Sequence, residues 1–158
     1  MTKFSIGEYW NLIKKQQLLD NVNEMLLNVN EKDFSRLAWY NRTLSGQIYY
    51  NSRYQYWVLL QEYLTKFITV DQFITKIFEL EYDNDKIFNN FKWDLKQLIF
   101  FVFNHKLNEL NQSNLENLQE FGGLIREILE ECTYSDFTSE DEFEQSMRTF
   151  ISEFQDFL

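Results

Sequence analysis

The chain has 158 residues, a formal net charge of −10 and 44% hydrophobic residues, among them 16 Phe, 9 Tyr and 4 Trp. This length and apolar content suit one folded domain and exclude a disordered acidic tail. The absence of Pro and the presence of only 4 Gly favour long helices, and a single Cys excludes an intramolecular disulfide and a Cys-based metal site.

Helical periodicity recurs along the chain, and no segment sustains the alternation of a strand. The sequence therefore predicts an all-α, single-domain bundle of about six to seven helices spanning residues 1–158. The first three helices are expected at residues 6–29, at residues 33–44 with Gly46 as the stop signal, and at residues 47–67. A fourth begins at Thr69, because Thr69 and Gln72 have the spacing of a capping box.

The second half of the chain has one clear break and three further helices. The Asp-Asn-Asp sequence of residues 83–85 predicts the break. The fifth helix follows it, and its apolar residues 98–103 predict a place at the bundle centre. The sixth helix is expected at residues 113–132, and the last begins at Ser139 with capping-box spacing to Glu142.

The compartment is predicted from two further features. The first twelve residues have neither the basic nor the apolar part of a signal peptide. The longest wholly apolar run, residues 98–103, is far shorter than the ~18–20 residues that a membrane span needs. We therefore expect a cytoplasmic protein without a membrane partner.

The negative charge is concentrated in the C-terminal part, residues 109–158. This part contains 13 Asp/Glu and 2 Lys/Arg, a balance of −11, whereas residues 1–108 balance to +1. On the sixth helix the glutamates fall within one arc of about 100° and along roughly 22 Å of axis. Like charges at i, i+4 destabilise a helix by a few tenths of a kcal/mol, so helix stability gives no reason for the scarcity of Lys and Arg.

We interpret this acidic part as a docking surface for a basic protein, such as a nuclease or another nucleic-acid-binding protein. Two alternatives remain open, namely ordinary solvated helix faces and a cation site. Repulsion by phosphates argues against direct nucleic-acid binding. The sequence does not predict the oligomeric state. The predicted partner-binding residues are Glu116, Glu120, Glu127, Glu130, Glu131, Asp136, Glu140, Asp141 and Glu144.

No catalytic, cofactor-binding or metal-binding residue is predicted, and we do not expect an enzyme. The only histidine, His105, has Glu109 at i+4 but no second His or Cys to complete a metal site. Cys132 lies on the apolar side of its helix, where burial and nearby carboxylates raise a thiol pKa. The pair Gly122-Gly123 indicates either a helix break or a close helix crossing.

The aromatic residues 49–57 support an alternative function. They are interpreted mainly as a core stripe, but Tyr50 and Tyr54 project away from it, and Tyr and Trp are good interface anchors. The alternative is therefore a structural or accessory subunit of a larger assembly, anchored by Tyr50, Tyr54 and Trp39.

Residues 63–74, Tyr-Leu-Thr-Lys-Phe-Ile-Thr-Val-Asp-Gln-Phe-Ile, resemble a pattern of colicin D-type and related self-protective immunity proteins. In that pattern a helix ends in a short turn, and the next helix opens with an acidic residue and a Phe. The apolar helix around residues 98–103 and the acidic C-terminal helices are similar in kind. The resemblance implies a small cytosolic helical protein that inactivates a toxin nuclease by covering its basic active site, and it supports a stoichiometric inhibitor as the leading hypothesis.

Overall fold

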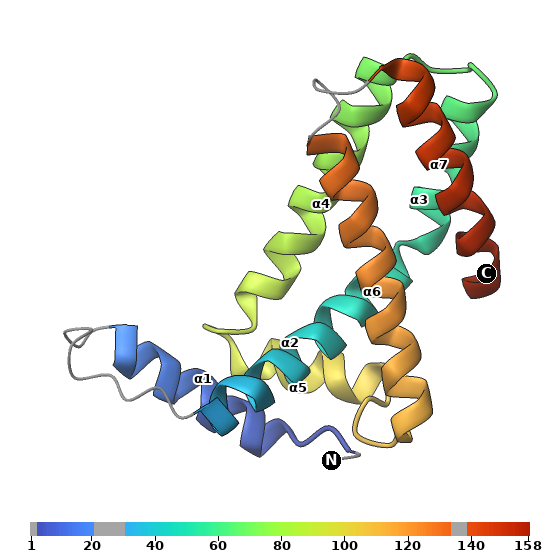
Figure 1. Ribbon diagram of the computed structural model, residues 1–158. Helices are drawn as coiled ribbons and strands as arrows, with labels where there is room; N and C mark the ends of the chain where they lie inside the picture. Colours follow the sequence, from blue (N-terminus) through green and yellow to red (C-terminus); the bar gives the residue numbers. More distant parts are fainter. Residues whose placement is uncertain (1–2, 21–30, 134–138) are drawn as a thin grey trace.

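The computed structural model describes residues 3–20, 31–133 and 139–158, with the side chains of residues 19 and 20 excepted. These residues form seven α-helices and one short 3₁₀ helix, and they contain no β-strand (Figure 1). The predicted all-α fold class is confirmed. The helices are α1 (Ile6–Asp20), α2 (Glu31–Asn51), α3 (Arg53–Leu64), α4 (Val70–Asn90), α5 (Leu95–Asn104), α6 (Gln112–Thr133), α7 (Glu140–Phe154) and the 3₁₀ helix η3 (Gln155–Phe157).

Helices α2 and α6 make the most extensive pairing in the molecule and cross near its middle (Figure 1). At one end, α3 packs on both α4 and α7, and α7 also packs on α6. At the other end, α1 contacts α2 and α5. None of the described helices combines the length and apolarity that a membrane span requires.

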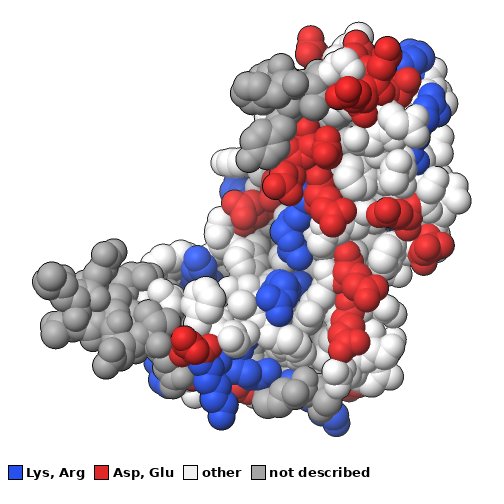
Figure 2. Space-filling model, in the orientation of Figure 1, with Lys and Arg blue, Asp and Glu red and all other residues white. Residues whose placement is uncertain are grey.

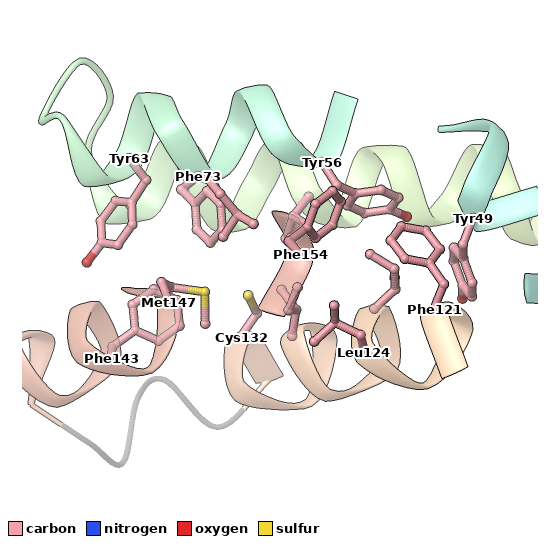
Figure 3. Close-up of a cluster of buried hydrophobic side chains, with 14 of the residues drawn as sticks. Tyr49, Tyr56, Tyr63, Phe73, Phe121, Leu124, Cys132, Phe143, Met147 and Phe154 are labelled. Carbon is pink, nitrogen blue, oxygen red and sulfur yellow. The ribbon is translucent and has the colours of Figure 1, made fainter. Parts of the chain in front are cut away.

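Each end of the molecule has its own hydrophobic cluster, and α6 contributes residues to both clusters. The larger cluster joins α3, α4, α6 and α7 and is rich in rings (Figure 3). The smaller cluster joins α1, α2, α5 and the first part of α6 through residues such as Tyr9, Tyr40, Leu98 and Leu118. Because α6 is fixed at both ends of the molecule, its outer face is held on a rigid support. The main members of the larger cluster are Tyr56, Leu60, Tyr63, Phe73, Ile77, Phe121, Ile125, Ile128, Phe143, Met147 and Phe154.

The expectation that Gly46 stops a helix is wrong, because Gly46 lies inside α2 at its crossing with α6. A Cβ atom on Gly46 would lie 2.2 Å from the carbonyl oxygen of Leu118. A Cβ atom on Gly122 would lie 3.1 Å from the Cα of Gly46. Of the two interpretations of the Gly122-Gly123 pair, the close helix crossing is the correct one for Gly122.

The helix breaks differ from the predicted ones in two further places. Helices α2 and α3 are separated at Ser52, inside the segment expected to be continuous. Residues 83–85 lie within α4 and do not break it, because Asn84 is buried and finds tertiary partners. Its Nδ2 donates to the Tyr56 hydroxyl at 2.9 Å, and its Oδ1 accepts from Ser52 Oγ at 3.1 Å. The break occurs instead at residues 91–94, where Asp94 caps α5.

The predicted central position of the apolar helix is also wrong, since α5 lies at the surface. Only Leu98 and Val102 of α5 are buried, whereas Phe100 is 72% exposed and Phe103 is 56% exposed. Burial on one side is sufficient to hold α5 in place. Its opposite side therefore presents aromatic rings that have no cover among the described residues.

Four of the expected helix starts are confirmed, the first of them at Ile6. Thr69 and Gln72 form the complete capping box of α4, and the hydroxyl of Ser139 accepts from the backbone N–H of Glu142 at the start of α7. Helix α6 matches the predicted sixth helix within one residue at each end. The first helix is described only as far as Asp20, and the rest of its predicted range lies outside the described residues.

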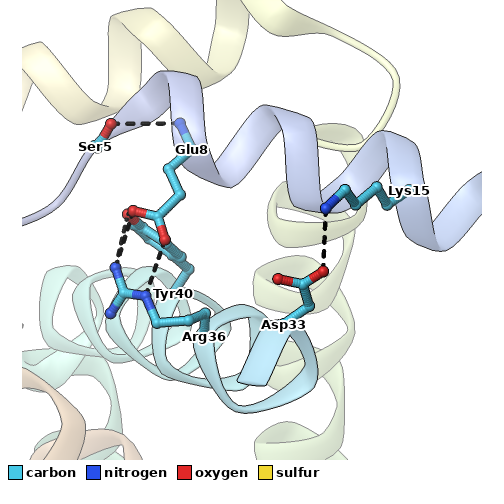
Figure 4. Close-up of polar contacts among 6 residues, drawn as sticks. All are labelled: Ser5, Glu8, Lys15, Asp33, Arg36 and Tyr40. Atoms are coloured by element: carbon cyan, nitrogen blue, oxygen red, sulfur yellow. Dashed lines mark hydrogen bonds and ion pairs between the residues drawn. The ribbon is translucent and has the colours of Figure 1, made fainter. Parts of the chain in front are cut away.

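A polar cluster fastens α1 to α2 (Figure 4). Arg36 Nε donates to Glu8 Oε1 at 2.9 Å, and the Tyr40 hydroxyl donates to Glu8 Oε2 at 2.8 Å. The Arg36 hydrogen bond is the main cause that lowers the pKa of Glu8 below its usual value. Lys15 and Asp33 form a second ion pair between the same helices, at 3.1 Å.

Candidate functional site

The outer face of α6 carries the central part of the predicted docking surface. Glu116, Glu120, Glu127 and Glu130 are exposed, as the helical periodicity predicted. None of the four forms an ion pair with a lysine or arginine in the described part of the chain, although Glu116 accepts a hydrogen bond from Gln112. Glu131 is half-buried beside Cys132 and is less accessible than the others.

This row of carboxylates is interrupted near its middle by Gly123. Glu120 and Glu127 are seven residues apart, or roughly 10 Å along the helix axis. A Cβ atom on Gly123 would meet nothing within 4 Å, so the gap between the two carboxylates is open. In Figure 2 the acidic side chains of this face accordingly form separate groups, with basic and uncharged side chains between them.

The predicted residues of α7 divide into two kinds. Glu140 and Asp141 are exposed in the first turn, where carboxylates also interact favourably with the helix dipole. Glu144 is half-buried and forms ion pairs with Lys66 and with Arg148. The Lys66 contact is the main cause that lowers the pKa of Glu144. Glu144 is therefore partly neutralised, while Asp136 lies outside the described residues.

The structure brings Glu120 of α6 and Asp156 of η3 to one groove, and this pairing was not predicted from the sequence. The groove has a volume of about 600 Å³ and lies between α2, α6 and η3. Tyr50, Phe157 and Leu118 supply its apolar part. Two carboxylates beside aromatic rings are the surroundings in which Lys and Arg side chains bind well. The pairing depends on the tertiary position of η3, so no sequence spacing could reveal it.

A second hollow beside the acidic row is lined by two arginines. It has a volume of about 370 Å³, and Arg42 of α2 and Arg126 of α6 both line it. Arg126 lies 3.5 Å from the hydroxyl of Ser45, and its charge also acts on Glu81. Arg126 thus serves the packing of α2, α4 and α6, and its charge lies at the border of the acidic row.

The three aromatic anchors of the alternative function occupy different surroundings. Trp39 is half-buried and stacks beside Arg36, whose guanidinium lies 5.1 Å from the ring centre. Tyr50 is half-buried and meets Phe121 edge-on. Tyr54 alone is well exposed, at 55%.

His105 lines the same groove as Glu120 and Asp156, whereas Cys132 is buried. His105 Nε2 lies 3.2 Å from the side-chain amide of Asn51, and burial lowers the pKa of the imidazole. Burial, with a smaller effect of Glu131, raises the pKa of the Cys132 thiol to about 12, in the predicted direction. A thiol in this state is a weak nucleophile. Within the described ranges, no group of three or more His, Cys, Asp or Glu side chains could hold a metal ion.

Comparison of the chain with protein-family models finds no match. The search of the curated proteins and the search of the solved structures also find no similar protein. The resemblance to colicin D-type immunity proteins stays a prediction.

Proposed function

We propose that this protein is a non-catalytic, stoichiometric inhibitor of the immunity type, which acts in the cytoplasm by covering the basic surface of a nucleic-acid-acting protein. One observation carries the proposal, namely that Glu116, Glu120, Glu127 and Glu130 are exposed on one face of α6 and form no ion pair with a described Lys or Arg. Glu140 and Asp141 extend the same negative charge to the start of α7.

The physical basis is the likeness between a carboxylate row and a row of phosphates. A protein that binds nucleic acid lines its groove with Lys and Arg, which form strong hydrogen bonds with either kind of anion. A net charge of −11 over residues 109–158 attracts such a surface and raises the association rate. Because α6 is anchored in both hydrophobic clusters, its carboxylates need little reorganisation on binding.

The test begins with affinity capture using the wild-type chain and identification of the captured basic protein by mass spectrometry. The purified partner is then titrated with the wild-type chain at low and high salt. We expect one-to-one binding that weakens as salt rises, together with displacement of nucleic acid from the partner. A complex in which the partner still binds nucleic acid at full strength would refute the inhibitor proposal.

A matched pair of double variants locates the binding face. Glu120→Lys with Glu127→Lys reverses two carboxylates of the α6 row, and we expect binding to weaken at least a hundredfold, or ~1.4 kcal/mol for each residue. Glu79→Lys with Asp83→Lys makes the same change of net charge on exposed positions of α4. If both pairs weaken binding equally, total charge and not the α6 face determines affinity.

The second candidate function, an accessory subunit of a larger assembly, is favoured by the exposed side of α3. Tyr54 and Val58 are 55% and 49% exposed, one helical turn apart, and both line a groove of about 530 Å³ beside α4. Sedimentation at low and high salt separates the two candidates. An assembly subunit associates through apolar surface and does so more strongly at high salt, whereas a charge-driven inhibitor stays monomeric.

A further inference from the structure

The outward side of α5 carries two exposed aromatic rings, and a third exposed ring directly precedes the helix. Trp93, just before the helix, is 76% exposed, and Phe100 and Phe103 are 72% and 56% exposed. The two phenylalanines lie three residues apart, on the side opposite the buried Leu98 and Val102. Phe is normally buried, and an exposed group of large rings marks a surface that binds something apolar.

Lysines accompany these rings. Residues 91–106, which include α5, contain three Lys and one acidic residue, a balance of +2, and Glu109 follows three residues later. Lys92, Lys96 and Lys106 are exposed and form no ion pair with a described carboxylate. The one acidic residue, Asp94, is engaged as the N-cap of α5 and accepts from the backbone N–H of Gln97.

Charge and rings share one face of the helix. Lys96, Phe100 and Phe103 have i, i+4, i+7 spacing, which places them in one row along α5. The acidic first turn of α7 lies at the opposite end of the molecule from α5 (Figure 1), and exposed charges are screened over about 8 Å at physiological ionic strength, so that turn does not cancel the charge of the lysines. Glu120 and Asp156 lie nearer, in one groove with His105 at the C-terminal end of α5, and not on the row of Lys96, Phe100 and Phe103.

We propose that the outward face of α5 binds the surface of an anionic lipid bilayer. Trp93, Phe100 and Phe103 enter the boundary between headgroups and acyl chains, and Lys92, Lys96 and Lys106 contact lipid phosphates. Aromatic rings flanked by lysines are the composition of helices that lie in this boundary, where lysine stems cover apolar surface and their charges stay in water. Charge complementarity selects an anionic bilayer over a neutral one.

This binding needs no spanning helix. The expectation of no membrane partner rested on the absence of signal-peptide features and on the short apolar run. A helix that lies at the surface, as α5 does, can bind a bilayer without either feature. The acidic face of α6 and α7 and the aromatic face of α5 use different residues, so each can be tested without altering the other.

The test measures binding of the full chain to vesicles of phosphatidylcholine with and without one third phosphatidylglycerol. Trp93 is an internal probe, because the other three tryptophans are half-buried. We expect binding to the anionic vesicles only, with quenching of Trp93 fluorescence by lipids brominated on their acyl chains. The variant Trp93→Phe should lose this quenching while it still binds.

Matched variants separate specific insertion from general stickiness. Phe100→Ser with Phe103→Ser should weaken vesicle binding at least tenfold, whereas Phe67→Ser, at a 79% exposed ring between α3 and α4, should leave it within twofold. Lys96→Gln should weaken binding about fivefold, and Lys76→Gln on α4 should have no effect. All of these side chains are exposed, so circular dichroism should show unchanged folding.

Three outcomes would overturn the proposal. The first is failure of the wild-type chain to bind anionic vesicles, and the second is equal binding to neutral ones. The third is self-association in sedimentation that disappears in the Phe100→Ser/Phe103→Ser variant while vesicle binding does not depend on these rings. That result would show that a second copy of the chain covers this face.

Discussion

The crossing of α2 and α6 predicts opposite effects of the same substitution at two glycines. In a helix interior, Ala is more stable than Gly by about 1 kcal/mol, because the unfolded glycine loses more backbone freedom. At Gly123 a new Cβ atom meets nothing within 4 Å, so Gly123→Ala should give the full gain of about 1 kcal/mol. This position serves as the control.

At Gly46 the same methyl group has no room. It would lie 2.2 Å from the carbonyl oxygen and 2.7 Å from the carbonyl carbon of Leu118, and both atoms belong to the backbone of α6. No side-chain rotation relieves this contact, so the two helices must move apart along their most extensive pairing. Overpacking of this kind costs ~3 kcal/mol or more, which leaves a net destabilisation of about 2 kcal/mol for Gly46→Ala after the helix gain is subtracted.

The assay is urea unfolding followed by circular dichroism, together with thermal unfolding. For a chain of this size, 1 kcal/mol corresponds to about 2–4 °C, so Gly46→Ala should lower Tm by about 4–8 °C and Gly123→Ala should raise it by about 2–4 °C. A Gly46→Ala variant that is as stable as the wild-type chain would refute the close crossing and, with it, the stated register of α2 on α6.

Three further predictions concern stability. Asn84→Ala should lower the free energy of unfolding by about 1–3 kcal/mol, because it leaves the buried Tyr56 hydroxyl without its partner; an unchanged urea midpoint would contradict this. Thr69→Ala should cost about 1 kcal/mol through loss of the capping box of α4, while Thr75→Ala on the exposed side of α4 should change stability by less than about 0.5 kcal/mol. Glu8→Gln should lower stability at pH 7 by less than about 1 kcal/mol, since the pair with Arg36 is partly exposed. The folded-state pKa of Glu8 is lowered, so its contribution is present above the ordinary carboxyl pKa of 4.5 and is lost as the pH falls through the folded value. The difference between the variant and the wild-type chain should therefore narrow in acid, and a constant difference would show that the ion pair is not its source.

Features that depend on neighbouring residues alone were predictable from the sequence. The caps at Thr69 and Ser139 were predictable because each uses a side chain and a backbone N–H three residues away. Helix α6 was predictable because its apolar residues keep one phase over its whole length, and its exposed glutamates follow from that phase.

Three of the failures share one cause, which is that a distant segment changes the meaning of a local signal. In the sequence, Gly46 indicates the end of a helix, but α6 approaches Gly46 so closely that only glycine fits there. In the sequence, Asn84 indicates a loop, but its hydrogen bonds with Tyr56 and Ser52 allow it to lie within a helix. The pairing of Glu144 with Lys66 joins residues 78 positions apart, so no helical-wheel argument could separate Glu144 from its exposed neighbours.

The exposed carboxylates of α6 do not stabilise the fold. Pairs such as Glu116/Glu120 and Glu127/Glu131 place like charges at i, i+4, which destabilises a helix by a few tenths of a kcal/mol each. Replacing Glu120 by Gln removes one such repulsion from an exposed position, so stability should be unchanged or slightly higher. A loss of partner binding in that variant then reflects the surface alone. Because these glutamates lower the stability of their helix, a role in binding explains them better than a role in folding.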